Sequence, residues 1–482
     1  MTTIPTWNDM LPLVPEAFLL GATLALLLAD LFVSRQRRGL THFLAIVVLV
    51  LTAILTARPQ AGAQSAFGGM FVRDAFADLA KLGILLTTVA VFVYAKPYLK
   101  PRGLFQGEFY VLCLTGVLGM MLMVSAGSLI MVYLGLELLA LSSYALVALN
   151  RDSPLSSESA MKYFVLGALA SGMLLYGMSM LYGATGTLDL SRIHAAASIA
   201  YHDQRMLLLF GLVFVVVGLA FKFGAAPFHM WLPDVYQGSP TAVTLFIAAA
   251  PKIAAFGMSW RLLEGGLASL ANDWQGMLAV LALLSLAIGN LVAIAQTNLK
   301  RMLAYSTISH VGFLFLGLLA GSREGYAAAL FYALTYAITT VAAFGMIVLL
   351  SRGDFEAEEI DDFKGLNQRS AWYAGMMLMV MASLAGVPIW VGFVAKLAVL
   401  QAAVADFLWL AIAAGVFAVI GSFYYLRVIK VMYFDSPARM EPLSLPADVP
   451  FRFVLSVNGL LLLALGVASG PLWAWCLRAI PG

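Results

Sequence analysis

The stretch that decides the fold of this chain is Val215-Val-Val-Gly-Leu-Ala-Phe-Lys222-Phe-Gly224-Ala-Ala-Pro227-Phe-His229-Met-Trp-Leu-Pro233-Asp234. It begins as an apolar membrane helix and then places a lysine inside the apolar run. Pro227 should break this helix after Gly224, because proline lacks the N–H and clashes with the preceding turn. A lysine at the centre of a membrane helix costs roughly 2.5–3.5 kcal/mol on insertion scales. Two readings stay open, a proline kink with Lys222 snorkelling to the headgroups and a water-lined proton site at a discontinuous helix.

The composition predicts an all-α polytopic membrane protein. The chain has 482 residues, of which 62% are hydrophobic and 11% are charged, and its mean hydropathy is +0.93. A soluble domain is nearer to about 25% charged. The N-terminus lacks the positive segment of a cleaved signal peptide, so the first apolar run is expected to stay as a span.

Spanning helices need about 20 mostly apolar residues, and the sequence predicts about fourteen of them. Lysine and arginine concentrate in the odd-numbered connections, which the positive-inside rule places in the cytoplasm, with both termini outside. The longest connection, Ser351–Arg369, is acidic and is interpreted as a solvated connection, with a docking face as the alternative. The predicted spans are Leu11–Val33, Leu40–Thr56, Ala75–Tyr94, Glu108–Val124, Ser128–Leu149, Ala160–Tyr182, Met206–Phe223 with a broken extension to Tyr236, Pro240–Leu262, Trp274–Ala295, Met302–Ala320, Tyr326–Leu350, Ala371–Ala403 (long and interrupted), Phe407–Phe434 and Phe451–Trp475.

The sequence shows no means of holding an electron carrier, a metal or a nucleotide. Its two cysteines, Cys113 and Cys476, cannot assemble an iron–sulfur cluster, which normally takes four thiolates. No Gly-x-Gly-x-x-Gly follows a strand and no Walker pattern occurs. Any transport path must therefore run through the helix bundle itself.

A weak internal repeat divides the chain. Leu139-Ala-Leu-Ser-Ser-Tyr144 resembles Leu303-Ala-Tyr-Ser-Thr-Ile308. Each unit holds an odd number of spans, so successive copies would cross in opposite directions, as in inverted-repeat transporters. The second copy should then carry its own break, and Gly386 with Pro388 supplies it in front of Lys396. The predicted organisation is a three-helix segment at 1–107, a first repeat at 108–262, a second repeat at 263–434 and a C-terminal helix at 435–482.

Glu137 lies near the middle of its predicted span, where an ionised carboxylate is costly, so it should be neutral or paired. Its expected partners are Lys222 and Lys162, and a structural ion pair between helices is the alternative to a proton site. Lys162 lies near the start of its span, so snorkelling is also open to it. Asp78 and Lys81 are expected to neutralise each other as i, i+3 neighbours.

Lys252 follows Pro251 near mid-membrane and has no opposite charge in its own helix. Lys396 is similarly placed after the second break. His229 can continue a polar path beyond the first break, and His310 falls near the depth of Glu137 in the other copy. Each histidine could equally be a satisfied core residue.

Together these residues predict a proton path. Movement of Glu137 toward or away from Lys222 would load or unload that lysine. Lys252 would receive the proton and pass it across the repeat interface to Lys396, the exit residue, with hydrated gaps and the histidines as relays. Each charge moved works against about 2.3 kcal/mol per 100 mV of membrane potential.

These residues resemble the antiporter-like subunits of proton-pumping NADH:quinone oxidoreductase (respiratory complex I). Within that family the sequence resembles subunit N, the bacterial counterpart of mitochondrial NADH dehydrogenase subunit 2. Subunit M is expected to carry a glutamate where this chain has Lys396, and subunit L has a long C-terminal lateral helix. The resemblance is carried by Gly135-Leu-Glu137 with Leu139–Tyr144, Phe221-Lys222 to Pro233-Asp234, Val235–Thr241, Pro251-Lys252, Lys300–His310 and Gly386–Lys396.

The resemblance implies a proton channel in a bacterial inner membrane, with both termini periplasmic. It implies Glu137, Lys222, Lys252 and Lys396 as principal titrating residues, with Lys162 and His229 in support. NADH, FMN, iron–sulfur clusters and quinone would belong to other subunits, and this subunit would hold no cofactor. Partners would be the neighbouring antiporter-like subunit, small membrane subunits of the membrane arm, lipid, protons and water, and no nucleic acid. The alternatives are a subunit of a related cation/proton antiporter and a structural membrane scaffold with inert buried ion pairs.

Overall fold

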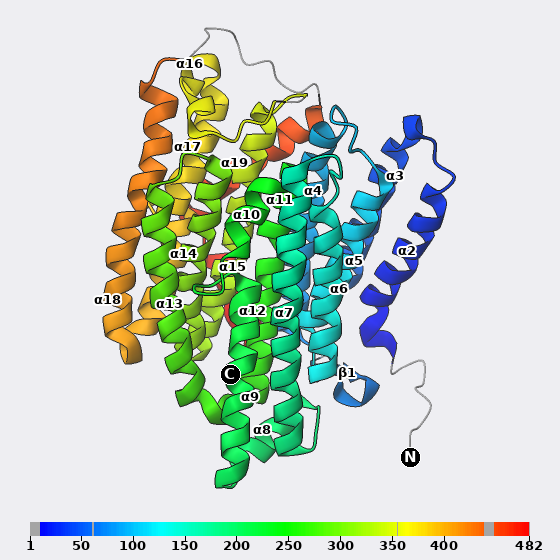
Figure 1. The fold of residues 1–482 in the computed structure, drawn as a ribbon, viewed down its shortest axis with the longest axis vertical. Helices are drawn as coiled ribbons and strands as arrows, with labels where there is room; N and C mark the ends of the chain where they lie inside the picture. Colours follow the sequence, from blue (N-terminus) through cyan, green and yellow to red (C-terminus); the bar gives the residue numbers. More distant parts are fainter. Residues whose placement is uncertain (1–9, 60–61, 354, 438–447, 482) are drawn as a thin grey trace.

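The fold is a bundle of helices that run along its long axis, shown by a computed structural model that describes residues 10–59, 62–353, 355–437 and 448–481 (Figure 1). Within these residues, 13 helices are long and apolar enough to cross a membrane. The helices α2 and α3 form one flank of the bundle, and α18 forms the opposite flank (Figure 1). The predicted class, an α-helical polytopic membrane protein, is therefore confirmed.

The long helices follow one another with short connections. They are α2 (Val14–Asp30), α3 (Gly39–Thr56), α4 (Ala75–Leu99), α5 (Gly107–Val124), α6 (Leu129–Val147), α7 (Pro154–Thr185), α9 (His202–Phe223), α11 (Thr241–Ala248) continued by α12 (Ala250–Trp260), α13 (Ala271–Ile294), α14 (Leu299–Leu319), α15 (Arg323–Leu350), α18 (Val391–Phe434) and α19 (Val449–Val467). Shorter helices are α8 (Leu190–Ser198), α10 (Trp231–Gly238), α16 (Leu366–Arg369), α17 (Ala371–Ala385) and α20 (Gly470–Ala479), with a π-helical turn η4 (Arg261–Gly266) and the 3-10 turns η1 (Leu11–Leu13), η2 (Arg35–Arg37), η3 (Phe67–Gly69), η5 (Ala268–Leu270) and η6 (Ile360–Phe363).

The helix α18 is too long to be one crossing. It has 44 residues, and at about 1.5 Å per residue it would measure about twice the 30 Å hydrocarbon core. Phe407, with φ −129° and ψ 43°, is non-helical and divides it. The first half, joined to α17, makes the predicted interrupted crossing, and the second half makes the next. Counted in this way, the described helices give the fourteen crossings that the sequence predicts.

Three local features depart from the prediction. A small antiparallel hairpin, β1 (Gln64–Ala66) with β2 (Phe71–Arg73), stands between α3 and α4 in an otherwise helical fold. The last predicted span ends early at Val467, because the Gly470-Pro471 pair begins the separate helix α20. The crossing that carries Lys252 is itself interrupted at Ala249, which has φ −106° and ψ −82°. Ala249 directly precedes α12, and Pro251 lies in the first turn of that helix. Proline is favoured in the first turn of a helix, where its missing N–H has no intrahelical partner.

The centre of the bundle is made by α11, α12, α14 and α15. We compare the share of residues that are buried in the most apolar part of each crossing. This share is 100% in Thr241–Gly266 and 94% in both α14 and α15. The corresponding share is only 33% in α7 and 22% in α18, so these helices face outward. Lys252 and His310 therefore lie on the helices that are most completely enclosed by protein.

Candidate functional site

The first break closes α9 with a Schellman motif. Gly224 takes a left-handed conformation, with φ 75° and ψ 33°. Its N–H donates to Phe221 O at 2.9 Å, and the N–H of Ala225 donates to Ala220 O at 2.8 Å. This bonding pattern satisfies two of the last carbonyl groups and leaves that of Phe223 free. Glycine is required here because a left-handed conformation is costly for a residue with a Cβ.

Lys252 binds the free carbonyl group at that end of α9. Its side chain is 3% exposed, and Nζ donates to the carbonyl oxygen of Phe223 at 2.6 Å. The ammonium also lies 5.9 Å from the centroid of the Trp231 ring. A cation is stabilised at the C-terminus of a helix by the partial negative charge of the free carbonyls. The helix break therefore provides a polar site for a lysine inside an apolar core.

The second break repeats the arrangement. Gly386 has φ 83° and ψ 37°, and its N–H donates to Ser383 O while that of Val387 donates to Ala382 O, at 3.1 and 3.0 Å. Lys396 then donates from Nζ to both remaining carbonyls, those of Leu384 and Ala385. The two distances are 2.8 and 3.0 Å.

The polypeptide between the helix halves is also satisfied by neighbours. The N–H of Ala226, which precedes Pro227 in a cis peptide bond, donates to Ser285 Oγ at 2.9 Å. Beyond Pro388, the N–H of Gly392 donates to Ser383 Oγ at 3.2 Å. Irregular backbone at membrane depth is tolerated when it is buried in protein in this way.

Lys222 and Glu137 face each other from α9 and α6 without direct contact. Lys222 is partly buried in the last turn of α9. Glu137 Oε1 is buried and has no hydrogen-bond partner in the part of the chain that the structure describes. A cavity of about 10 Å³ beside Lys222 is lined by Tyr144 and Trp231, among others. A volume of this order is the minimum that can hold one water molecule.

Lys162 does not pair with Glu137, so that expected ion pair is wrong. Its Nζ lies 2.8 Å from Glu158 Oε1 and 2.9 Å from Asp234 Oδ2. Asp234 also binds Arg301 of α14, at 2.8 Å. The cause of the difference is that α7 begins at Pro154, so Lys162 lies on its third turn, with its side chain 45% exposed.

The two histidines have different surroundings. His229 lies in the first break, and its Nδ1 is buried without a hydrogen-bond partner among the described residues. His310 is 7% exposed, and its two ring nitrogens lie 2.6 Å from Tyr332 Oη and 3.1 Å from Tyr425 Oη. A cavity of about 20 Å³ extends from His310 to Ser383 and Leu384 at the second break. His310 is therefore part of a polar network that reaches the site of Lys396.

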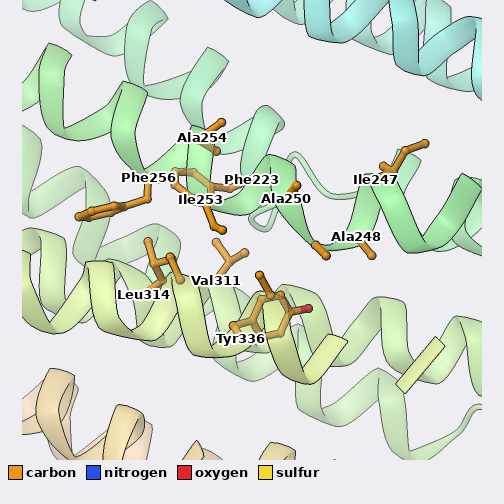
Figure 2. Close-up of a cluster of buried hydrophobic side chains, with 14 of the residues drawn as sticks. Phe223, Ile247, Ala248, Ala250, Ile253, Ala254, Phe256, Val311, Leu314 and Tyr336 are labelled. Carbon is orange, nitrogen blue, oxygen red and sulfur yellow. The ribbon is translucent and has the colours of Figure 1, made fainter. Parts of the chain in front are cut away.

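An apolar cluster lies between α12 and α14. Figure 2 shows Ile253 of α12 facing Val311 and Leu314 of α14, with Phe223 alongside. These four side chains are 0–3% exposed. Ile253 and Val311, which directly follow Lys252 and His310 in the sequence, are thus part of one buried apolar cluster, and the hydrated connection expected between Lys252 and Lys396 stays a prediction.

Sequence reasoning missed two groups of buried charges. Lys300 was assigned to a connection, but it lies in the first turn of α14 and is 2% exposed. Lys81 does not pair with Asp78, because Glu16 of α2 lies 2.6 Å from its Nζ, whereas Asp78 binds Arg73 at 2.9 Å. An i, i+3 spacing brings two side chains near each other, but it carries no information on partners from other helices.

Within the described residues, no group of three His, Cys, Asp or Glu side chains could hold a metal ion.

The fold and its two lysine-bound helix ends define a polytopic membrane protein with interrupted helices. Residues 126–421 match the family model described as NADH:quinone oxidoreductase/Mrp antiporter, TM, and the chain belongs to this family.

Related sequences align with this chain over nearly its whole length. The chain is 56% identical to NADH-quinone oxidoreductase subunit N of Thioalkalivibrio sulfidiphilus, over 98% of both chains. It is 58% identical to subunit N of Xanthomonas euvesicatoria pv. vesicatoria, over 99% of this chain and 98% of that one. A chain of respiratory complex I from Thermus thermophilus with bound aureothin is 32% identical and superposes with a TM-score of 0.79, over 95% and 98% of the two chains.

Proposed function

We propose that this chain is a proton-translocating subunit N of bacterial NADH:quinone oxidoreductase. The observation that carries the proposal is the repeated contact of a buried lysine with the free carbonyls of an interrupted helix, Lys252 on Phe223 and Lys396 on Leu384 and Ala385. A proton carrier in a membrane must be stable in both protonation states. The helix end stabilises the ammonium, and desolvation favours the neutral amine. The relatives named as subunit N support the assignment to this enzyme.

The proton path that we propose begins at Glu137 and Lys222, continues to Lys252, and leaves through Lys396. Glu137 Oε1 is buried without a hydrogen-bond partner among the described residues, so a movement of α6 or α9 that brings Lys222 closer would stabilise the lysine in its charged form. His310 serves as a relay on the Lys396 side, and His229 extends the polar path at the first break. Lys162 belongs to the ion pairs around Asp234 and supports the first repeat.

The dry cluster around Val311 would act as the barrier between the two halves of the path. Proton transfer from Lys252 requires that this cluster admits water in another conformation of the enzyme. In the resting conformation it prevents a leak across the membrane. We propose the inverted repeats at 108–262 and 263–434 as the frame for this exchange, since both copies carry a glycine-ended helix with a lysine on its carbonyls.

The remaining parts of the enzyme are proposed to lie elsewhere. NADH, FMN, iron–sulfur clusters and quinone would be bound by partner subunits, and the neighbouring antiporter-like and small membrane subunits would contact this chain. The location is the bacterial inner membrane, with the connections rich in lysine and arginine in the cytoplasm and both termini in the periplasm.

The test is the replacement Lys222→Met in the assembled enzyme, with NADH-driven proton pumping measured in inverted membrane vesicles. Pumping should fall by about half or more while assembly is retained. A structural scaffold would show the opposite, with less assembled enzyme and normal pumping in what remains. The second candidate, a cation/proton antiporter subunit, is favoured by the family description, and it predicts that affinity purification recovers other antiporter subunits and no redox subunits.

A further inference from the structure

A polar cavity of about 400 Å³ lies at the end of the bundle that carries the connections rich in lysine and arginine. Its walls come from segments that are far apart in the sequence: the end of α4, the link between α10 and α11, the start of α14 and the connection that follows α15. The lining includes Tyr98, Arg102, Ser239, Lys300, Glu356 and Glu358. A cavity of this size holds many water molecules, since one needs only about 10–15 Å³.

Glu356 is the carboxylate at which these segments meet. Its Oε2 accepts from Tyr98 Oη at 2.9 Å and from Arg102 Nη2 at 3.0 Å. Its Oε1 accepts from the hydroxyl of Thr241 and lies 4.0 Å from Lys300 Nζ. The side chain is 22% exposed, so the interpretation of its connection as simply solvated is wrong for this residue. Glu356 therefore faces both the cavity and a buried lysine.

Lys300 repeats the pattern of the two lysines at the helix breaks. Its Nζ donates at 2.9 Å to the carbonyl oxygen of Ser239, which directly follows the last residue of α10. The side chain is 2% exposed, so Lys300 forms the inner wall of the cavity. Three charged or titratable groups face the pair. They are Tyr98 of α4, Arg102 just beyond the end of α4, and Glu358, which lies on the same connection as Glu356.

Polar side chains continue from Lys300 along one face of α14. Thr307 and His310 follow Lys300 at seven and ten residues, which is close to two and three helical turns. Thr307 accepts from Tyr336 Oη at 2.7 Å. One cavity of about 10 Å³ is lined by Thr307 and Tyr336, and the next, of about 20 Å³, by Tyr336 and His310. These two cavities share Tyr336 and Leu384 as lining residues, so they lead from the middle of α14 toward the second break.

We propose that Glu356 and Lys300 form a proton-uptake site that supplies Lys396 along α14, independently of Lys222 and Lys252. A hydronium ion in the cavity protonates the Glu356 carboxylate, which hands the proton to the neutral Lys300 amine. The Lys300 ammonium then releases its proton to a neighbouring water, and hydrogen-bonded water admitted along α14 carries it over the interval of about 10 Å to Thr307, so that only O–H and N–H bonds form and break. This inference rests on the proposed proton-translocating function and adds a second inlet to it.

The test compares Glu356→Gln with Asp361→Asn in the assembled enzyme. Asp361 lies on the same connection, is 71% exposed and pairs only with Lys364 among the described residues, so its variant controls for the loss of one negative charge. NADH-driven proton pumping is measured in inverted vesicles, whose outer face is the cytoplasmic one, from about pH 6 to about pH 9. The uptake site predicts that E356Q pumps normally at low pH and loses up to about half of its pumping at high pH, where protons are scarce and only the path through Lys222 and Lys252 still supplies Lys396. D361N should keep the wild-type profile.

A role of Glu356 as a mere anchor for its connection would give a different result. The amount of assembled enzyme would fall, and the pH profile of the assembled fraction would match that of the wild type, which would overturn the proposal. Lys300→Met tests the same pair from the other side and should show the same loss at high pH. Failure of both variants to assemble would assign the pair a structural role and would also overturn it.

Different variants test the proposed path through Lys252 and the proposed uptake site at Glu356. Lys252→Met, measured in the same vesicles, addresses the proposed function alone. Normal pumping by K252M with a pH-selective loss in E356Q would contradict the path through Lys252 and keep the inlet. Loss of pumping in K252M with a wild-type profile in E356Q would keep the proposed function and remove the inlet.

Discussion

The ammonium of Lys252 lies 2.6 Å from the carbonyl oxygen of Phe223, the last residue of α9. This contact makes the helix end and the charge depend on each other. The break leaves a carbonyl that needs a donor, because the Schellman hydrogen bonds do not reach it. The lysine needs an acceptor, because an unpaired charge in an apolar core is costly. Lys396 and Ala385 show the same dependence at the second break.

Replacement of Lys252 by methionine should remove the share of NADH-driven proton pumping that reaches Lys396 through Lys252, about half or more, in keeping with the loss of a proton-transfer group. Methionine has a similar length and fills the space, so the loss would come from the titrating nitrogen. Dye quenching in inverted vesicles measures pumping, and a native gel measures assembly. Lys430→Met is the control, since Lys430 is 64% exposed. Unchanged pumping by assembled K252M enzyme would contradict the prediction.

Alanine at Gly224 or Gly386 should destabilise the subunit by about 1–2 kcal/mol at each position, because both have a left-handed backbone. A Cβ at Gly224 would also lie 2.3 Å from Leu232 Cδ1, and one at Gly386 would lie 3.0 Å from Lys396 Cδ. Thermal inactivation of the purified enzyme measures the effect. Gly415→Ala is the control, since a Cβ at this helical position meets nothing within 4 Å. Equal inactivation temperatures for all three variants would rule out the prediction.

The ion pair between Lys162 and Asp234 should contribute little to stability, because both side chains are partly exposed to solvent. A double-mutant cycle with Lys162→Met and Asp234→Asn measures the coupling from thermal inactivation.

K162M should retain more pumping than K222M, since Lys162 lies among outward-facing ion pairs. Equal losses of pumping in K162M and K222M would show that Lys162 belongs to the main path.

Introducing a hydroxyl into the apolar cluster, with Val311→Thr, should increase passive proton leak. Ile253, Val311, Leu314 and Phe223 are hydrocarbon side chains that offer water no hydrogen bond, and a hydroxyl at position 311 would supply one. The decay of a preformed pH gradient in vesicles without NADH measures the leak. Val419→Thr on α18, where the side chain is 73% exposed, is the control. A decay no faster than that of V419T would argue against the cluster as the barrier.

The sequence by itself determined the class of fold, the crossings and the positions of the two breaks. These follow from local chemistry, since about 20 apolar residues must form a helix in a bilayer and the Gly224–Pro227 and Gly386–Pro388 pairs cannot continue one. It also identified lysines at membrane depth as candidates, because each one is costly there. The break before Pro251 was open to the same argument and was missed, since a proline in the first turn of a new helix resembles one inside a longer helix.

Only the tertiary structure decided which groups face each other. Lys162 binds Asp234 rather than Glu137, Lys81 binds Glu16 rather than Asp78, and Glu356 folds back onto Lys300. These choices depend on how helices distant in sequence pack and rotate, and sequence spacing carries no information on that. The dry cluster at Val311 is likewise invisible in the sequence, where apolar residues that seal a proton path look the same as those that face lipid.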